Sequence, residues 1–264
     1  MERDKFLLCL GDSFTWGQGL YLPSWLERKP NVFNDFLETH ESSQKEIGMQ
    51  WMDQEPFFDK HDLRIKEKLS FTGIVGEALN RKVIKKKGNG GSISTNLVQL
   101  NNTTFDYYIN DYMNEERVNL YDPFYKRDCI IIFQFSSVGR EDFENLTEQE
   151  SNLVFETSKS FKDIINDRMK VLFDKVDSKL MEIESKFGYK YYYLDWLGDF
   201  YDFKPEKFIT INGHHYFNMM TSTQYIKIPY KDKYIIDGHI NAYGNEVIAR
   251  NILKKIEKDL VNSK

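Results

Sequence analysis

The sequence predicts a single α/β domain, a three-layer α/β/α sandwich in which helices cover both faces of a central, mostly parallel sheet. Two observations carry this prediction. Strand-like and helix-like stretches alternate along the chain, and the clearest strand, residues 128–135, is an apolar run of the kind that is covered on both faces. The chain has 264 residues, enough to bury a large core as one domain spanning residues 1–264.

Apolar runs and apolar spacing predict the elements of the first half of the chain. A five-residue apolar run predicts a buried strand that ends in a tight turn at Gly11, Asp12 and Ser13. Residues from about 21 to 69 are charged and aromatic without periodicity, which indicates an insertion. The expected elements are a strand at 6–10, a helix at 71–79 after Ser70 as N-cap, a strand at 81–87, a glycine-rich turn at 88–91 and a helix from about 95 to 113.

The second half alternates more regularly. Residues 158–187 have apolar residues at helical spacing and predict the longest helix. Residues of about 198–234 break the alternation, so we expect a second insertion that is loop-rich with some extended pieces. The remaining expected elements are strands at 128–135 and 189–194 and a carboxyl-terminal helix at 241–260.

Composition and motif absences exclude several functional classes. Lys and Arg total 36 against 41 Asp and Glu, a net charge of −5, so no nucleic-acid partner is expected. Neither a signal-peptide core nor a membrane span is visible, which predicts a cytoplasmic or otherwise soluble protein. Cys9 and Cys129 lie inside apolar runs and are expected to be buried, inert thiols. Nucleotide-binding and metal-binding motifs are absent, so neither cofactor nor metal is expected.

Two glycine-containing motifs near opposite ends of the chain carry residues suited to catalysis. Ser13 follows a strand on a tight turn, where helix N–H groups help to stabilise an oxyanion. Asp12 or Ser13 acting only as an N-cap gives the same pattern. Ahead of the last helix, Asp237 and His239 are two residues apart, which suits a histidine base oriented by a carboxylate. A capping aspartate beside a surface histidine is the alternative there.

Taken together, these motifs resemble the SGNH (GDSL) hydrolase family. The residues that carry the resemblance are Gly11-Asp12-Ser13-Phe14-Thr15-Trp16-Gly17, the later turn Asn89-Gly90-Gly91, and Asp237-Gly238-His239-Ile240-Asn241-Ala242-Tyr243-Gly244. The resemblance covers residues of about 5–260, with strong local matches only in the two end segments. It implies a flavodoxin-like SGNH hydrolase fold and a serine esterase with Ser13 as nucleophile, His239 as general base and Asp237 as the orienting carboxylate.

The resemblance also implies an oxyanion hole. Its donors would be the Ser13 backbone N–H, a glycine N–H that we assign to Gly91, with Gly90 as the alternative, and an asparagine side chain after the third strand. Ser136 stands where that asparagine is expected, and losing one such donor costs about 3 kcal/mol of transition-state stabilisation. The other candidates for this donor are Gln134, Ser137 and Asn96. The single residue between Asp237 and His239 is a second departure, because the family commonly has two.

The expected partner is a small-molecule or glycan ester with a small acyl group, most simply an O-acetyl group on a carbohydrate. An O-acyltransferase that uses the same triad is one alternative, and a weakly active or inactive binding or structural protein is another. Candidates for substrate binding are Asp12, Gln134, Asn96 and Arg140, although Arg140 equally fits a pair with Glu141 or Asp142. Aromatic residues make up 15% of the chain and concentrate at about 21–68 and 191–234, where they either line the cleft or form core.

Overall fold

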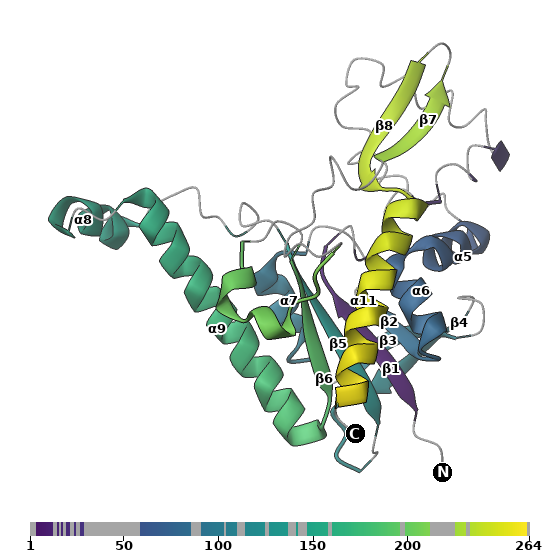
Figure 1. Cartoon of the computed structure of the whole chain (residues 1–264), viewed down its shortest axis with the longest axis horizontal. Helices are drawn as coiled ribbons and strands as arrows, with labels where there is room; N and C mark the ends of the chain where they lie inside the picture. Colours follow the sequence, from purple (N-terminus) through teal and green to yellow (C-terminus); the bar gives the residue numbers. More distant parts are fainter. Residues whose placement is uncertain are drawn as a thin grey trace.

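A computed structural model describes the fold around a four-stranded parallel sheet with the order β2-β1-β5-β6 (Figure 1). The strands are β1 (Lys5–Leu10), β2 (Lys82–Lys85), β5 (Asp128–Phe135) and β6 (Lys190–Asp195). They confirm the four strands predicted for the central sheet and its parallel direction. The structure describes residues 4–12, 15, 17, 20–21, 24, 27–28, 59–85, 91–102, 104–109, 114–124, 127–136, 141, 147–157, 160–195, 199–211, 225–230 and 233–262, with backbone alone at 106–109, 114–115, 153–156, 225–230, 233–238 and 262.

Helices cover both faces of this sheet, so its strands are apolar on both sides. Leu8 of β1 packs in the core formed with α9 (Phe161–Phe187) and α7 (Ile93–Gln99). Its neighbour Leu7 packs in the opposite core, formed with α6 (Phe71–Ala78) and α11 (Ala242–Asn262). The uninterrupted apolar runs of β1 and β5 follow from this double burial, and the layered α/β prediction is confirmed at this level.

Capping residues set the ends of the main helices. The Ser70 hydroxyl accepts a hydrogen bond from the Gly73 N–H at 3.2 Å and caps α6, as predicted. Ser160 and Asp163 form a capping box at the start of α9, and Gly188 ends that helix with φ of +73°. The apolar positions predicted along α9 are mostly buried, but Phe161 in its first turn is 47% exposed. A further helix, α8 (Glu148–Thr157), precedes α9.

The helix predicted from about 95 to 113 is wrong. The helix α7 ends at Gln99, and residues beyond it form an antiparallel hairpin of β3 (Thr104–Ile109) and β4 (Asn114–Asn119). Phe105 pairs with Val118 across this hairpin, and both side chains are buried. Threonine, isoleucine and aromatic residues dominate β3 and favour a strand, whereas apolar spacing over so short a stretch does not separate a period of two from one of 3.6.

The two expected insertions contain short elements where the structure describes them. The first includes the helix α5 (Lys60–Leu69), which begins after an Asp59 cap, while residues 29–58 lie outside the described residues. In the second, residues 198, 212–224 and 231–232 lie outside the described residues. Its elements are the 3₁₀ turns η3 (Tyr201–Phe203) and η4 (Pro205–Lys207) and the antiparallel hairpin β7 (Tyr225–Tyr230) and β8 (Lys233–Ile240). In Figure 1 this hairpin lies on the side where the parallel strands end.

Two aromatic residues of the second insertion, Phe200 and Phe208, belong to the core, whereas Phe203 is exposed. The Phe200 ring stacks on Phe135 of β5 with centroids 4.3 Å apart, and Phe208 packs against Tyr193 at 5.0 Å. The Ile209 N–H donates to the Tyr193 carbonyl oxygen at 2.9 Å, which continues the sheet edge beyond β6. The buried aromatic residues of 191–211 therefore stabilise the fold.

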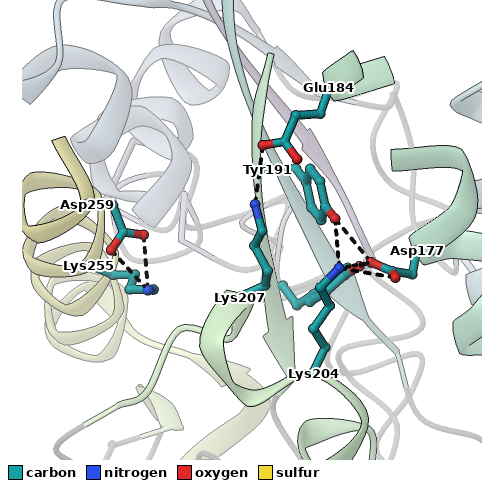
Figure 2. A network of polar contacts seen from close by, with 8 residues as sticks. Asp177, Glu184, Tyr191, Lys204, Lys207, Lys255 and Asp259 are labelled. Atoms are coloured by element: carbon teal, nitrogen blue, oxygen red, sulfur yellow. Dashed lines mark hydrogen bonds and ion pairs between the residues drawn. The ribbon is translucent and has the colours of Figure 1, made fainter. Parts of the chain in front are cut away.

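A polar network fastens the 3₁₀ turns to α9 (Figure 2). The Asp177 carboxylate accepts hydrogen bonds from the hydroxyls of Tyr191 and Tyr193, and Lys204 donates to it at 2.9 Å. Burial raises the pKa of the Asp177 carboxyl, but the bonds from Tyr193 and Lys204 outweigh burial and hold that pKa below its usual value. Burial also raises the pKa of Tyr193.

Both cysteines are buried free thiols, as predicted. Burial raises the pKa of Cys129 to about 12 and also raises that of Cys9, so neither is a reactive thiolate near neutral pH. Among the helices that the structure describes, none combines the length and the apolar character that crossing a bilayer requires.

Candidate functional site

The strand order of the sheet indicates where a ligand would bind. From β1 the chain runs to β2 on one side, and after β2 it returns to β5 on the other side of β1. Ligands of open α/β sheets bind beyond the carboxyl ends of the strands at such a reversal. Gly11 and Asp12 follow β1, and Ser136 follows β5, so all three lie at this reversal.

Asp12 and Gln134 hold each other at the ends of these two strands. Asp12 is 4% exposed, and its Oδ1 accepts a hydrogen bond from the Gln134 Nε2 at 2.6 Å. The Gln134 Oε1 accepts a hydrogen bond from the Thr15 hydroxyl. Both ends of the Gln134 amide thus bind to residues flanking position 13. These bonds connect Gln134 to the turn after β1, and the candidacy of Asp12 and Gln134 for substrate contact stays a prediction.

Gly91, in the predicted glycine-rich turn, and Asn96, on the helix after it, contact the same Gly11–Asp12 turn. Asn96 on α7 is fully buried, and its Nδ2 donates to the Gly11 carbonyl oxygen at 3.1 Å. This bond fixes the orientation of the amide, because a carbonyl oxygen only accepts. A β-carbon added to Gly91 would overlap the Gly11 carbonyl oxygen and would lie 3.1 Å from the Asn96 Oδ1. Only glycine permits this approach of the two backbones.

Two polar atoms at this edge have no hydrogen-bond partner within the described part of the chain. They are the Ser136 hydroxyl, in a residue 2% exposed, and the Asn96 Oδ1. Buried polar atoms are normally paired, so these two atoms are candidates for contact with a ligand. Ser136 is the residue predicted to replace the family asparagine.

The segment after β5 returns to the start of α7. The Glu141 carboxylate accepts hydrogen bonds from the Ile93 N–H and from the Ser94 N–H and hydroxyl, the last at 2.6 Å. These N–H groups have no partner inside the helix. Glu141 therefore connects the chain beyond Ser136 to the helix that carries Asn96. Arg140, its predicted partner, lies outside the described residues, as do Ser13, Gly90 and Ser137.

His239 lies half-buried at the end of β8, directly before α11. Tyr225 pairs with Ile240 and Ile226 pairs with Asp237, so the register shifts and leaves Gly238 and His239 as extra residues. Such β-bulges redirect side chains and occur next to active sites. Asp237 belongs to β8, but its side chain lies outside the description. Its role with His239 stays a prediction.

Asn245 is a site residue that sequence reasoning missed. It is 3% exposed on α11, its Oδ1 accepts from the Phe71 N–H at 2.9 Å, and its Nδ2 donates to the carbonyl oxygens of Ile240 at 3.0 Å and Asn241 at 3.1 Å. It therefore joins the end of β8 to the start of α6. The sequence signal was a polar residue on the apolar stripe of the last helix.

Sequence reasoning also missed a buried cluster of charged side chains near Gly17. Lys85 ends β2 and pairs with Glu67 at 2.7 Å, Lys66 lies 3.7 Å from the same carboxylate, and all three side chains are 1–2% exposed. A β-carbon added to Gly17 would lie 3.5 Å from the Lys66 Cγ and 3.0 Å from the Ser70 Cβ. The cluster therefore lies beside the segment that follows residue 13. Its signal was a lysine at the end of an apolar strand.

The described residues contain no group of three potential ligands that could hold a metal ion. They do assemble glycine, amide and hydroxyl groups around the residue before Ser13. Comparison of the chain with protein-family models, with curated proteins and with solved structures gave no match. The functional argument therefore depends on the residues themselves and on the resemblance that they carry.

Proposed function

We propose that the protein is a serine esterase of the SGNH type. Ser13 attacks the carbonyl carbon of a small acyl ester, His239 takes the hydroxyl proton, and Asp237 orients the imidazole. The proton then passes to the departing alcohol, and water hydrolyses the acyl-enzyme. The substrate that we propose is an O-acetyl ester of a carbohydrate, and this part depends on the family resemblance alone.

One observation carries the proposal: two distant segments of the chain, residues 91–96 and the end of β5, meet at the Gly11–Asp12 turn. Asn96 donates to the Gly11 carbonyl oxygen, Gln134 donates to the Asp12 carboxylate, and Gly91 packs against Gly11 without room for a side chain. A nucleophilic serine and its oxyanion donors must be held this closely, because misplacement by about 1 Å can cost about 100-fold in rate.

The orphaned Ser136 hydroxyl supports an oxyanion role for that residue. A side-chain donor is useful to catalysis only if it is free to bind the developing negative charge. Asn96 and Gln134, the other candidates that the structure describes, each already donate one amide hydrogen to the Gly11–Asp12 turn, which holds their side chains toward that turn. The Ser136 hydroxyl has no hydrogen-bond partner among the described residues, and we assign it as the third donor beside the N–H groups of Ser13 and Gly91.

Two assays test the proposal on the full chain. Hydrolysis of p-nitrophenyl acetate is expected to fall by about 1,000-fold or more in Ser13→Ala and His239→Ala. The matched controls are Ser160→Ala, at the exposed cap of α9, and His61→Ala, on the surface of α5, both of which should keep wild-type turnover. A fluorophosphonate probe should add its mass to the peptide that contains Ser13, with loss of fluoride.

The serine at position 136 favours one second candidate, a binding protein that keeps the fold without turnover. A hydroxyl is shorter than an amide and reaches less far toward an oxyanion. Wild-type protein that is folded by circular dichroism, yet neither hydrolyses the ester nor reacts with the probe, would support this candidate. Turnover that persists in Ser13→Ala would refute the triad.

A further inference from the structure

Two halves of the candidate site are joined by a single buried amide. The Asn245 Oδ1 binds the Phe71 N–H at the start of α6, while its Nδ2 binds the Ile240 and Asn241 carbonyl oxygens just after His239. Ser70, which precedes Phe71, lies against Gly17 of the segment that follows Ser13. A short path therefore runs from the strand end that carries His239 to the segment that carries Ser13.

Asn245 is a polar side chain on an otherwise apolar, buried helix face. It lies among the apolar residues Ile248, Ile252 and Ile256 on the buried face of α11, and a buried amide costs free energy unless it is hydrogen-bonded. The Asn245 amide bonds to Phe71 of α6 and to Ile240 and Asn241, the two residues directly before α11. The Phe71 N–H that it binds is one of the first N–H groups of α6, which lack a partner inside the helix.

The ladder of the hairpin does not pair His239. Its register shift leaves Gly238 and His239 without opposing residues in β7, so the ladder pairs Ile240 and Asp237 but not the histidine between them. Directly after this bulge, the Asn245 amide binds the carbonyl oxygens of Ile240 and Asn241.

We propose that Asn245 is a positioning residue, which fixes His239 relative to the Ser13 turn by joining the end of β8 to the start of α6. This inference rests on the proposed function. In addition, we infer that the distance between His239 and Ser13 depends on α6, to which Asn245 binds. Without the amide, the end of β8 loses its hydrogen-bonded connection to α6 and is held to it by apolar packing.

The test uses Asn245→Ala, with Asn251→Ala as the matched control. Asn251 lies on the same helix, and its Nδ2 donates to the Val247 carbonyl oxygen at 2.8 Å, away from the site. With p-nitrophenyl acetate, kcat should fall about 10- to 100-fold in Asn245→Ala with KM changed less than about twofold. Asn251→Ala should keep the wild-type kcat. Asn245→Asp keeps the size and the acceptor for Phe71 but loses the donor to Ile240, and should also lose kcat.

A spectroscopic readout separates positioning from stability and also from failure of the proposed function. The imidazole NMR signal of His239 is assigned among the five histidines by its loss in His239→Ala. It should shift in Asn245→Ala and Asn245→Asp and stay in place in Asn251→Ala. If Ser13→Ala retains turnover, the proposed function fails, and the NMR comparison still decides this inference. An unshifted His239 signal, or equal losses of kcat in Asn245→Ala and Asn251→Ala, would overturn it.

Discussion

Replacing Gly91 with alanine should push the chain at residue 91, directly before α7, away from the Gly11 turn. An added β-carbon would lie closer to the Gly11 carbonyl oxygen than 3.0 Å, the limit that real β-carbons respect, whereas ordinary contact begins at 3.4 Å. Relief of this overlap requires the two backbones to separate by several tenths of an ångström to about 1 Å. Because about 1 Å of misplacement can cost about 100-fold in rate, we expect a loss of about 10- to 100-fold in kcat.

The assay compares p-nitrophenyl acetate turnover and urea unfolding of Gly91→Ala with those of Gly188→Ala. Gly188 has φ of +73°, but no atom lies within 4 Å of an added β-carbon there. That control should therefore lose about 1–2 kcal/mol of unfolding free energy from backbone strain while keeping wild-type turnover. If Gly91→Ala keeps turnover within twofold of the wild type, the packing of Gly91 on Gly11 does not matter to catalysis, and this reasoning is refuted.

Three further predictions concern single side chains. Ser136→Ala should lower kcat by about 100-fold or more without lowering stability, because the hydroxyl has no described partner to lose; parallel kinetics and urea unfolding check this. Asp177→Asn should cost about 1–2 kcal/mol at pH 7. The pKa of Asp177 in the folded state lies below its unfolded value of about 3.9. The stability that this carboxylate contributes is therefore complete well above pH 4 and is lost as the pH falls through the folded-state pKa. Urea unfolding measured against pH should show that loss in the wild type and not in the variant. Phe135→Ala should cost about 3–5 kcal/mol in the same assay, whereas Phe124→Ala, at a residue 91% exposed, should change stability by less than about 0.5 kcal/mol.

Local sequence patterns predicted most of the layered core. Residues 6–10 and 128–135 were predictable as strands because each is apolar throughout, and the cap at Ser70 was predictable because the serine precedes apolar helical spacing. Residues 104–109 were mistaken for part of a helix, because apolar spacing over so short a stretch does not separate the two periods, and the pairing of Phe105 with Val118 is a contact between distant residues. The same limit applies to Phe161, which continues an apolar spacing but lies at an exposed helix end.

For the candidate site, the sequence by itself determined which residue types stand at strand ends: Gly11, Asp12, Gln134 and Ser136 were all named from their positions after or within apolar runs. Only the tertiary structure decided what these residues do to one another. The Gln134 amide bonds to Asp12 and Thr15, and the Ser136 hydroxyl has no hydrogen-bond partner among the described residues. Asn245 joins α11 to α6 across 174 positions of the chain. The physical reason is that helix and strand periods are local, whereas hydrogen bonds between distant segments depend on strand order and helix packing, which local spacing does not specify.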